Sequence, residues 1–213
     1  MQEADIEGKL VFDAGSGHGI LTSAVAGMGA KAIGMELSLA VDNACQRNTN
    51  ARAWYVQGDV QLPPFAPGIF DILYSNGVLH HTNNTKLSLS LVEPMLKAGA
   101  LICLWLYQPC ENKLHQLSTK ARRVFSKIPL KFAVAILIIF VLPFTFIIRK
   151  INGQFDLHYR EEIIDLLDAF TPEFRNEIPQ AQAMAWLQQL GLSTCGITSS
   201  GVFGYPITGC KTD

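Results

Sequence analysis

Short runs of consecutive apolar residues alternate along the chain with segments of helical spacing. Five such runs precede residue 110, and each predicts a strand of a buried sheet. They are residues 9–14, 32–37, 54–60, 70–78 and 100–107. Between the first two runs, residues 19–28 carry apolar side chains at helical spacing, and Gly29 ends the predicted helix. Strands that alternate with helices favour an α/β fold with a doubly wound parallel sheet.

The C-terminal part of the chain continues this pattern. Residues 180–190 predict a helix, with Gly191 directly after it. Residues 192–199 and 205–211 then predict two strands that are close enough in sequence to form a hairpin. No internal repeat or low-complexity linker interrupts the sequence. We therefore expect one domain over residues 1–213, with an insertion at residues 110–165 after the fifth strand.

The overall composition disfavours several classes of protein. A net charge of −1 gives no electrostatic reason to bind nucleic acid. The five cysteines are odd in number and include no C-x-x-C pair, which indicates neither a disulfide framework nor a metal site. This cysteine usage fits a reducing, cytoplasmic compartment. The first twenty residues have no basic segment followed by an apolar one, so they do not resemble a secretory signal.

A glycine-rich stretch, D-A-G-S-G-H-G, joins the first strand to the first helix and runs from Asp13 to Gly19. Its glycines allow a tight turn and a close approach of the backbone to a ligand. The helix start that follows offers N–H groups to an electron-rich ligand. The spacing is G-x-G-x-G, and Ile20 stands where a G-x-G-x-x-G motif requires glycine. This argues against a dinucleotide site, and therefore against a nicotinamide-dependent oxidoreductase, the first alternative function.

Two further acids end neighbouring strands. Glu36 ends the second strand, 21 residues after Gly15, and its carboxylate can accept hydrogen bonds from both hydroxyls of a ribose. Asp59 ends the third strand, where it can accept a hydrogen bond from an adenine amino group. Together with Asp13, these acids lie at the carboxyl ends of adjacent strands. Ligands of open α/β sheets bind at that edge.

Four motifs in this order, VFDAGSGHG, GMELS, QGDVQLPPF and FDILYSNGVLHHT, resemble the class I, Rossmann-like methyltransferases that use S-adenosyl-L-methionine (SAM). The resemblance covers residues 9–108 well and 165–213 loosely. It is greatest to the branch that includes ubiquinone- and menaquinone-pathway enzymes. It implies a seven-stranded, mostly parallel sheet in the order 3-2-1-4-5-7-6, SAM as the cofactor, and methyl transfer as the reaction.

The resemblance also assigns parts of the cofactor to strand ends. The glycine loop and the end of the fourth strand would face the methionine part, with Asp13 acting through water or the loop. The end of the second strand would bind the ribose, and the end of the third strand the adenine. The residues implied are Asp13, Gly15, Ser16, Gly17, Gly19, Glu36, Leu37, Asp59, Val60, Asn76 and Gly77.

Two histidines directly after the fourth strand are the candidates for catalysis. Methyl transfer from a sulfonium is an in-line displacement, so the protein mainly supplies alignment and exclusion of water. A base is needed only if the acceptor loses a proton. Of His80 and His81, we expect His81 to orient or deprotonate the acceptor, the alternative being a capping or packing role. Tyr107 and His158 are weaker candidates.

The insertion has its own character. Residues 110–150 contain eight Lys or Arg and a single acid, Glu111. Residues 132–148 carry no charge and as a helix would reach roughly 26 Å, which is marginal for a membrane span. A single crossing would separate two parts of one sheet, and Pro143 is expected to interrupt the helix.

Two interpretations of the insertion remain. It makes a peripheral membrane contact through residues 120–150, or it covers an acceptor pocket or a dimer partner. Both favour a small, apolar or lipid-like acceptor, such as a quinone or an isoprenoid-linked molecule. A second alternative function is a truncated or degenerate methyltransferase fold that acts as a non-catalytic module. It arises because the family usually has helices before the first strand, where only Met1 to Gly8 stand here. The methylated atom and the oligomeric state stay open.

Overall fold

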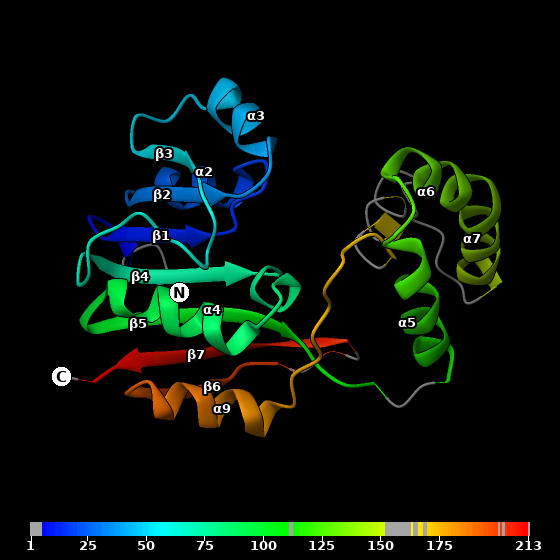
Figure 1. Cartoon of the computed structure of the whole chain (residues 1–213). Helices are drawn as coiled ribbons and strands as arrows, with labels where there is room; N and C mark the ends of the chain where they lie inside the picture. The colour runs from blue at the N-terminus through cyan, green and yellow to red at the C-terminus, as the bar shows by residue number, and fades with distance from the viewer. Residues whose placement is uncertain are drawn as a thin grey trace. The chain divides into compact units, whose positions relative to one another are not determined.

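The computed structural model describes residues 6–110, 113–151, 163, 166–167, 170–199, 201 and 203–212, with residues 113–118, 149 and 194–195 described by their backbone alone. The chain forms two compact units (Figure 1). The sheet unit comprises Met1–Pro109 and Asn176–Asp213, and the helical unit comprises Cys110–Arg175.

The sheet unit is built on one seven-stranded sheet in the order β3-β2-β1-β4-β5-β7-β6 (Figure 1). The strands β1 to β5 pair in parallel, whereas β7 runs antiparallel to both β5 and β6. Their bounds are β1 (Leu10–Ala14), β2 (Lys31–Glu36), β3 (Ala53–Gln57), β4 (Phe70–Asn76), β5 (Leu96–Tyr107), β6 (Leu192–Ile197) and β7 (Gly204–Lys211). The predicted fold class, sheet order and C-terminal hairpin are confirmed.

Helices cover both faces of this sheet. They are α2 (Ile20–Gly27), α3 (Ala40–Arg47), α4 (Thr85–Val92) and α9 (Gln180–Gln189), with short 3₁₀ turns at Leu79–His81 and Glu93–Met95. Helices α4 and α9 lie across the near face in Figure 1. Helix α2 packs on the opposite face, where Ala26 meets Ala32 and Ala53.

Alternation along the strands sorts apolar side chains to the two faces. Phe12 of β1 faces the larger core, and its ring centroid lies 5.0 Å from that of Phe70 and 5.1 Å from that of Phe65. The neighbouring residue Val11 faces the other side, where it packs against Ile72. Because both faces of β1 are buried, its carboxyl end is held firmly beneath the loop that follows.

The helical unit contains α5 (Lys113–Phe125), α6 (Leu130–Ile136), a π-helical turn (Leu137–Val141) and α7 (Leu142–Ile151). The last three are continuous, so the expected interruption at Pro143 is wrong. A π-helical turn directly before this proline changes the local hydrogen-bond pattern, which lets the helix continue past a residue without an N–H. Among the described residues, Leu130–Ile148 is the one helix long and apolar enough to cross a membrane, and 11% of its apolar window is buried.

Candidate functional site

The glycine loop after β1 is fastened to the end of β2. Gly15 and Ser16 both donate their backbone N–H groups to the Met35 carbonyl oxygen, each at 2.9 Å. Gly15, Gly17 and Gly19 all have positive φ values, of 99°, 52° and 77°. Side chains other than hydrogen strongly disfavour this backbone region, so the loop requires its glycines.

Space around the loop differs from one glycine to the next. A Cβ atom added at Gly15 would lie 2.2 Å from Val78 Cγ2, and one added at Gly19 would lie 2.5 Å from the Tyr55 ring. At Gly17 no atom lies within 4 Å of such a Cβ. The loop is therefore packed at both ends and open at its tip, where a ligand can approach the backbone.

Glu36 links the end of β2 to the glycine loop. Its Oε2 accepts the Gly17 N–H at 3.0 Å, and its Oε1 accepts the Ser38 N–H at 3.0 Å and the Ser38 hydroxyl at 2.7 Å. A carboxylate can accept about four hydrogen bonds, so Glu36 can take part in ligand binding when a ligand hydroxyl replaces that of Ser38. Leu37 beside it is exposed.

The end of β3 lies beside Glu36. Gln57 pairs with Glu36 in the sheet, and Gly58 donates its N–H to the Glu36 carbonyl oxygen at 3.0 Å. Asp59 follows, half-buried, and its Oδ1 accepts the Gln61 N–H at 2.8 Å. Val60 is buried in the larger core. These contacts bring Asp59 to the same edge of the sheet as Glu36.

The end of β4 completes this edge. Ser75 donates its hydroxyl to the Ala14 carbonyl oxygen at 2.8 Å, which ties β4 to β1 directly before the glycine loop. Asn76 is exposed, and Gly77 has a φ of 76° with no atom within 4 Å of an added Cβ. The predicted residues therefore come from the carboxyl ends of four adjacent strands, β3-β2-β1-β4.

Asp13 lies beneath the loop and is only 2% exposed. Its Oδ2 accepts hydrogen bonds from the Thr22 hydroxyl and, at 2.7 Å, from the Tyr74 hydroxyl. Burial raises the pKa of Asp13 to about 6, although the two hydrogen bonds oppose this shift. The pKa of Tyr74 is also raised, first by burial and then by the Asp13 charge. Asp13 thus joins β1, α2 and β4 under the glycine loop, which leaves the loop itself to face a ligand.

The two histidines after β4 differ in exposure. His80 is fully buried, with its ring centroid 4.3 Å from that of Tyr107 and 5.8 Å from that of Trp105. His81 is half-buried, and its ring lies 5.7 Å from that of Tyr107. His80 is therefore a packing residue of an aromatic cluster at the ends of β4 and β5, whereas His81 is the more accessible of the two. His158 lies outside the described residues.

The aromatic cluster is a feature that the sequence did not reveal as a unit. Trp105 and Tyr107 alternate on β5, which would have placed them on one face of the strand. Within the described ranges, no group of three or more His, Cys, Asp or Glu side chains could hold a metal ion.

Comparison with known proteins relates the fold of this chain to one family. Residues 12–104 match the family model described as "Methyltransferase domain". Over 88 residues the chain is 33% identical to malonyl-[acyl-carrier protein] O-methyltransferase from Legionella pneumophila. That match covers 39% of this chain and 31% of the Legionella protein.

Two solved structures of low sequence identity are similar in fold to this chain. A putative SAM-dependent methyltransferase from Listeria monocytogenes has a TM-score of 0.63 at 15% identity, covering 97% of this chain and 92% of that one. Magnesium protoporphyrin IX methyltransferase from Synechocystis PCC 6803, with bound SAH, has a TM-score of 0.59 at 17% identity, covering 99% and 77%. The fold is that of the class I SAM-dependent methyltransferases. These findings support the predicted enzyme class and the predicted cofactor, SAM.

Proposed function

We propose that this chain is a SAM-dependent methyltransferase that transfers a methyl group to a small, apolar or lipid-like acceptor. The observation that carries this proposal is the position of Glu36, whose carboxylate joins the tip of the glycine loop at the edge where four strands end. Residues 1–213 would act as one methyltransferase domain, with the helical unit as its insertion.

The chain's residues fit the cofactor. The open space beside Gly17 and Gly77 allows close approach of the methionine part to the backbone, together with Ser16 and Asn76. Glu36 would accept hydrogen bonds from the ribose hydroxyls. Asp59, two residues after the β3 residue that pairs with Glu36, would accept a hydrogen bond from the adenine amino group, and the exposed Leu37 side chain would offer apolar surface to the base.

Bound SAM supplies a methyl group already activated by its sulfonium charge. The protein then has to hold donor and acceptor in line and keep water out. His81 would orient the acceptor and, where the accepting atom carries a proton, take that proton. Its half-buried ring beside Tyr107 suits this role better than the fully buried ring of His80.

The acceptor class is inferred from surface chemistry. In the aromatic cluster beside His81, Trp105 is half-buried and Tyr107 is buried at the end of β5, and the helical unit exposes many large apolar side chains. A quinone or isoprenoid-linked acceptor, as in the quinone-pathway branch, matches both features. The non-catalytic alternative has no comparable support, because the glycine loop and Glu36 keep a geometry suited to binding.

Calorimetric titration of the full chain with S-adenosylhomocysteine tests the cofactor site. We expect binding by the wild type and an affinity reduced about 10- to 100-fold in Glu36→Gln, because hydrogen bonds to a charged acceptor contribute about 1.5–3 kcal/mol. Asp42→Asn, which alters an exposed acid of α3, should bind as the wild type does. A wild-type chain that binds neither SAM nor S-adenosylhomocysteine would contradict the proposal.

Transfer of a radiolabelled methyl group from SAM into quinone and lipid extracts tests the acceptor class. Once an acceptor is found, His81→Ala should lower kcat by roughly 100-fold or more if His81 is the base. If His81 only orients the acceptor, KM should rise while the pH profile of kcat stays unchanged. Full turnover in His81→Ala would remove this residue from the mechanism.

A further inference from the structure

The continuous helix Leu130–Ile151 of the helical unit exposes an unusually apolar surface. Large apolar side chains along it that are more than half exposed include Phe132, Ile139, Phe140, Phe144, Ile147 and Ile151. Phe140, Phe144, Ile147 and Ile151 recur at helical spacing, so they form one stripe. Contiguous apolar surface of this kind is costly in water and marks an interaction site.

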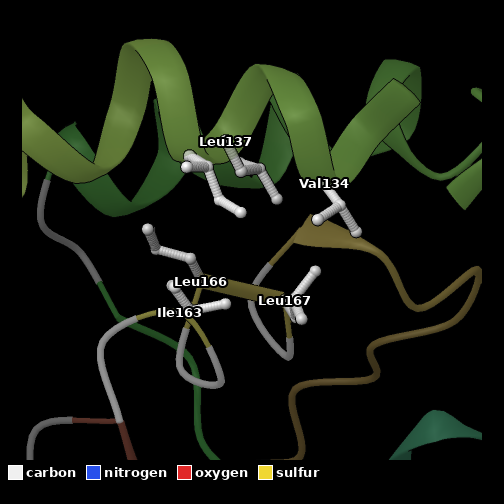
Figure 2. A pocket seen from close by; sticks show the side chains of 6 residues that line it. Val134, Leu137, Ile163, Leu166 and Leu167 are labelled. Atoms are coloured by element: carbon white, nitrogen blue, oxygen red, sulfur yellow. The ribbon is translucent and has the colours of Figure 1, made fainter. Parts of the chain in front are cut away.

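The other side of the same helix is occupied by protein. Ala133 and Leu137 are buried. Figure 2 shows Val134 and Leu137 directed toward Ile163, Leu166 and Leu167 of the same unit, and these side chains line an apolar pocket with no room for water. The helix therefore has one face packed within its unit and one face exposed, which is the arrangement of a helix that lies on a surface.

The charged residues of the sequence segment that carries the exposed stripe are all positive. From residue 113 to residue 151 the sequence contains no acid. Lys127 and Lys131 are exposed near one end of the helix, and Lys150 is exposed at the other. Lys131 lies 5.0 Å from the Phe132 ring centroid and Lys150 lies 5.5 Å from that of Phe146, so the cations border the apolar surface itself.

Not every basic residue in this unit belongs to that surface. Arg122 is buried, and its Nη1 donates to the Pro172 carbonyl oxygen at 3.2 Å and to that of Glu173 at 3.4 Å. It therefore fastens α5 to the segment before residue 176. The exposed lysines, in contrast, are positioned to meet negative charge outside the protein.

We propose that this exposed face, bordered by Lys127, Lys131 and Lys150, docks in the plane of an anionic lipid bilayer. Aromatic and aliphatic side chains would enter the boundary between headgroups and acyl chains, and the lysines would contact anionic headgroups. The docking concerns lipid binding alone and does not depend on the methyltransferase activity.

Chain connectivity opposes a full crossing. The 19 residues Leu130–Ile148 would reach about 28 Å as a helix, close to the thickness of a bilayer core. However, β5 precedes this helix and β7 follows it, and the two strands pair in one sheet. Residues 152–170 include Asp156, Arg160, Glu161, Glu162, Asp165 and Asp168. They are too charged to supply a return span, so the helix lies along the surface.

Flotation of the full chain with vesicles tests this docking. We expect binding to vesicles of phosphatidylcholine with phosphatidylglycerol at low salt, and at least about tenfold weaker binding to phosphatidylcholine alone. Lys127→Gln, Lys131→Gln and Lys150→Gln should each weaken binding about fivefold. Lys9→Gln and Lys31→Gln, which remove exposed lysines of the sheet unit, should leave it unchanged.

The apolar contribution is tested separately. Phe140→Asp and Phe144→Asp change side chains that are 71% and 63% exposed, so the fold should tolerate them. Each should weaken vesicle binding by about tenfold or more. The matched control is Leu62→Asp, at a residue of the sheet unit that is 79% exposed, which should have no effect.

Three results would overturn the proposal. One is an absence of binding to anionic vesicles at low salt. Another is self-association in solution that Phe140→Asp abolishes while vesicle binding is unaffected, since a second copy would then cover the face. The third is retention of the chain in vesicles after alkaline carbonate extraction, which indicates a spanning helix.

Discussion

The two units of this chain distribute their apolar side chains in opposite ways. In the sheet unit, large side chains such as Phe12 and Phe70 are fully buried, and polar side chains gather where the strands end. In the helical unit, Phe140 and Phe144 lie on the outside, and the buried apolar side chains among its described residues are Ala133, Leu137 and Leu166. The same residue types therefore stabilise a fold in one unit and offer an interaction surface in the other.

The two units also differ in how many side chains each proposed function depends on. The site of the sheet unit depends on single atoms, such as Glu36 Oε2 on the Gly17 N–H, and one substitution can remove it. The surface of the helical unit depends on area and charge summed over many side chains. Substitutions there should act gradually and nearly additively.

The largest difference in the free energy of unfolding is expected between equivalent substitutions in the two units. Phe12→Ala removes a fully buried ring and should lower the free energy of unfolding by about 3–5 kcal/mol. Phe140→Ala removes an exposed ring and should change it by less than about 0.5 kcal/mol. Urea denaturation of both variants checks this. Equal destabilisation would show that the helix face is buried in solution, and the contrast between the units would fail.

At the glycine loop we expect a smaller loss of stability, together with a loss of ligand binding. Gly15→Ala adds a Cβ that meets Val78 and adopts a φ of 99°, so it should destabilise the protein by about 2–4 kcal/mol and abolish binding of S-adenosylhomocysteine. Gly68→Ala is the control, because its φ of 66° gives strain with no atom within 4 Å. Thermal melts and calorimetry separate the two. If Gly15→Ala binds normally, the loop does not need its close packing.

Most of the fold and the edge of the site could be predicted from the sequence because both follow from local rules. Apolar runs give buried parallel strands, and the residues after them must lie at one edge of the sheet. For this reason alone, the sequence predicts that Glu36 and Asp59 lie at that edge. The order of the strands came from the family resemblance, since local patterns do not determine which strands pair.

Features that depend on distant partners could not be predicted. The resemblance implies that Asp13 acts on the methionine part through water or the loop, but it does not reveal that Tyr74, 61 positions away, and Thr22 donate hydrogen bonds to its carboxylate. His80 joins an aromatic cluster with Tyr107 of β5. Pro143 predicts a break in the helix, whereas the helix continues past this proline after a π-helical turn. In each case tertiary packing or a change of helix type overrides the local signal.

The buried carboxyl of Asp13 should make the stability of the sheet unit depend on pH. Its folded pKa of about 6 lies above the ordinary aspartate value of 3.8, so its favourable contribution is present below about pH 4 and is lost as pH rises through 6. The change is at most about 3 kcal/mol. Asp13→Asn should therefore gain stability relative to the wild type between pH 4 and 7, as measured by urea denaturation. A constant difference across this range would mean that Asp13 keeps an ordinary pKa.

Tyr74→Phe should cause the smallest change in stability, and it tests how the Tyr74 hydroxyl influences the pKa of Asp13. The Tyr74 hydroxyl donates to Asp13 and thereby lowers its pKa, so removing it should raise the pKa of Asp13 further. The upper end of the pH window of the stability change then moves upward, while stability at neutral pH falls by about 1 kcal/mol. The comparison of Tyr74→Phe with the double variant Tyr74→Phe/Asp13→Asn isolates this contribution. The Asp13 carboxyl keeps one partner in Tyr74→Phe, because Thr22 still donates a hydrogen bond to it. As a control, Phe140→Ala in the helical unit should leave the pH window of the stability change as it is in the wild type.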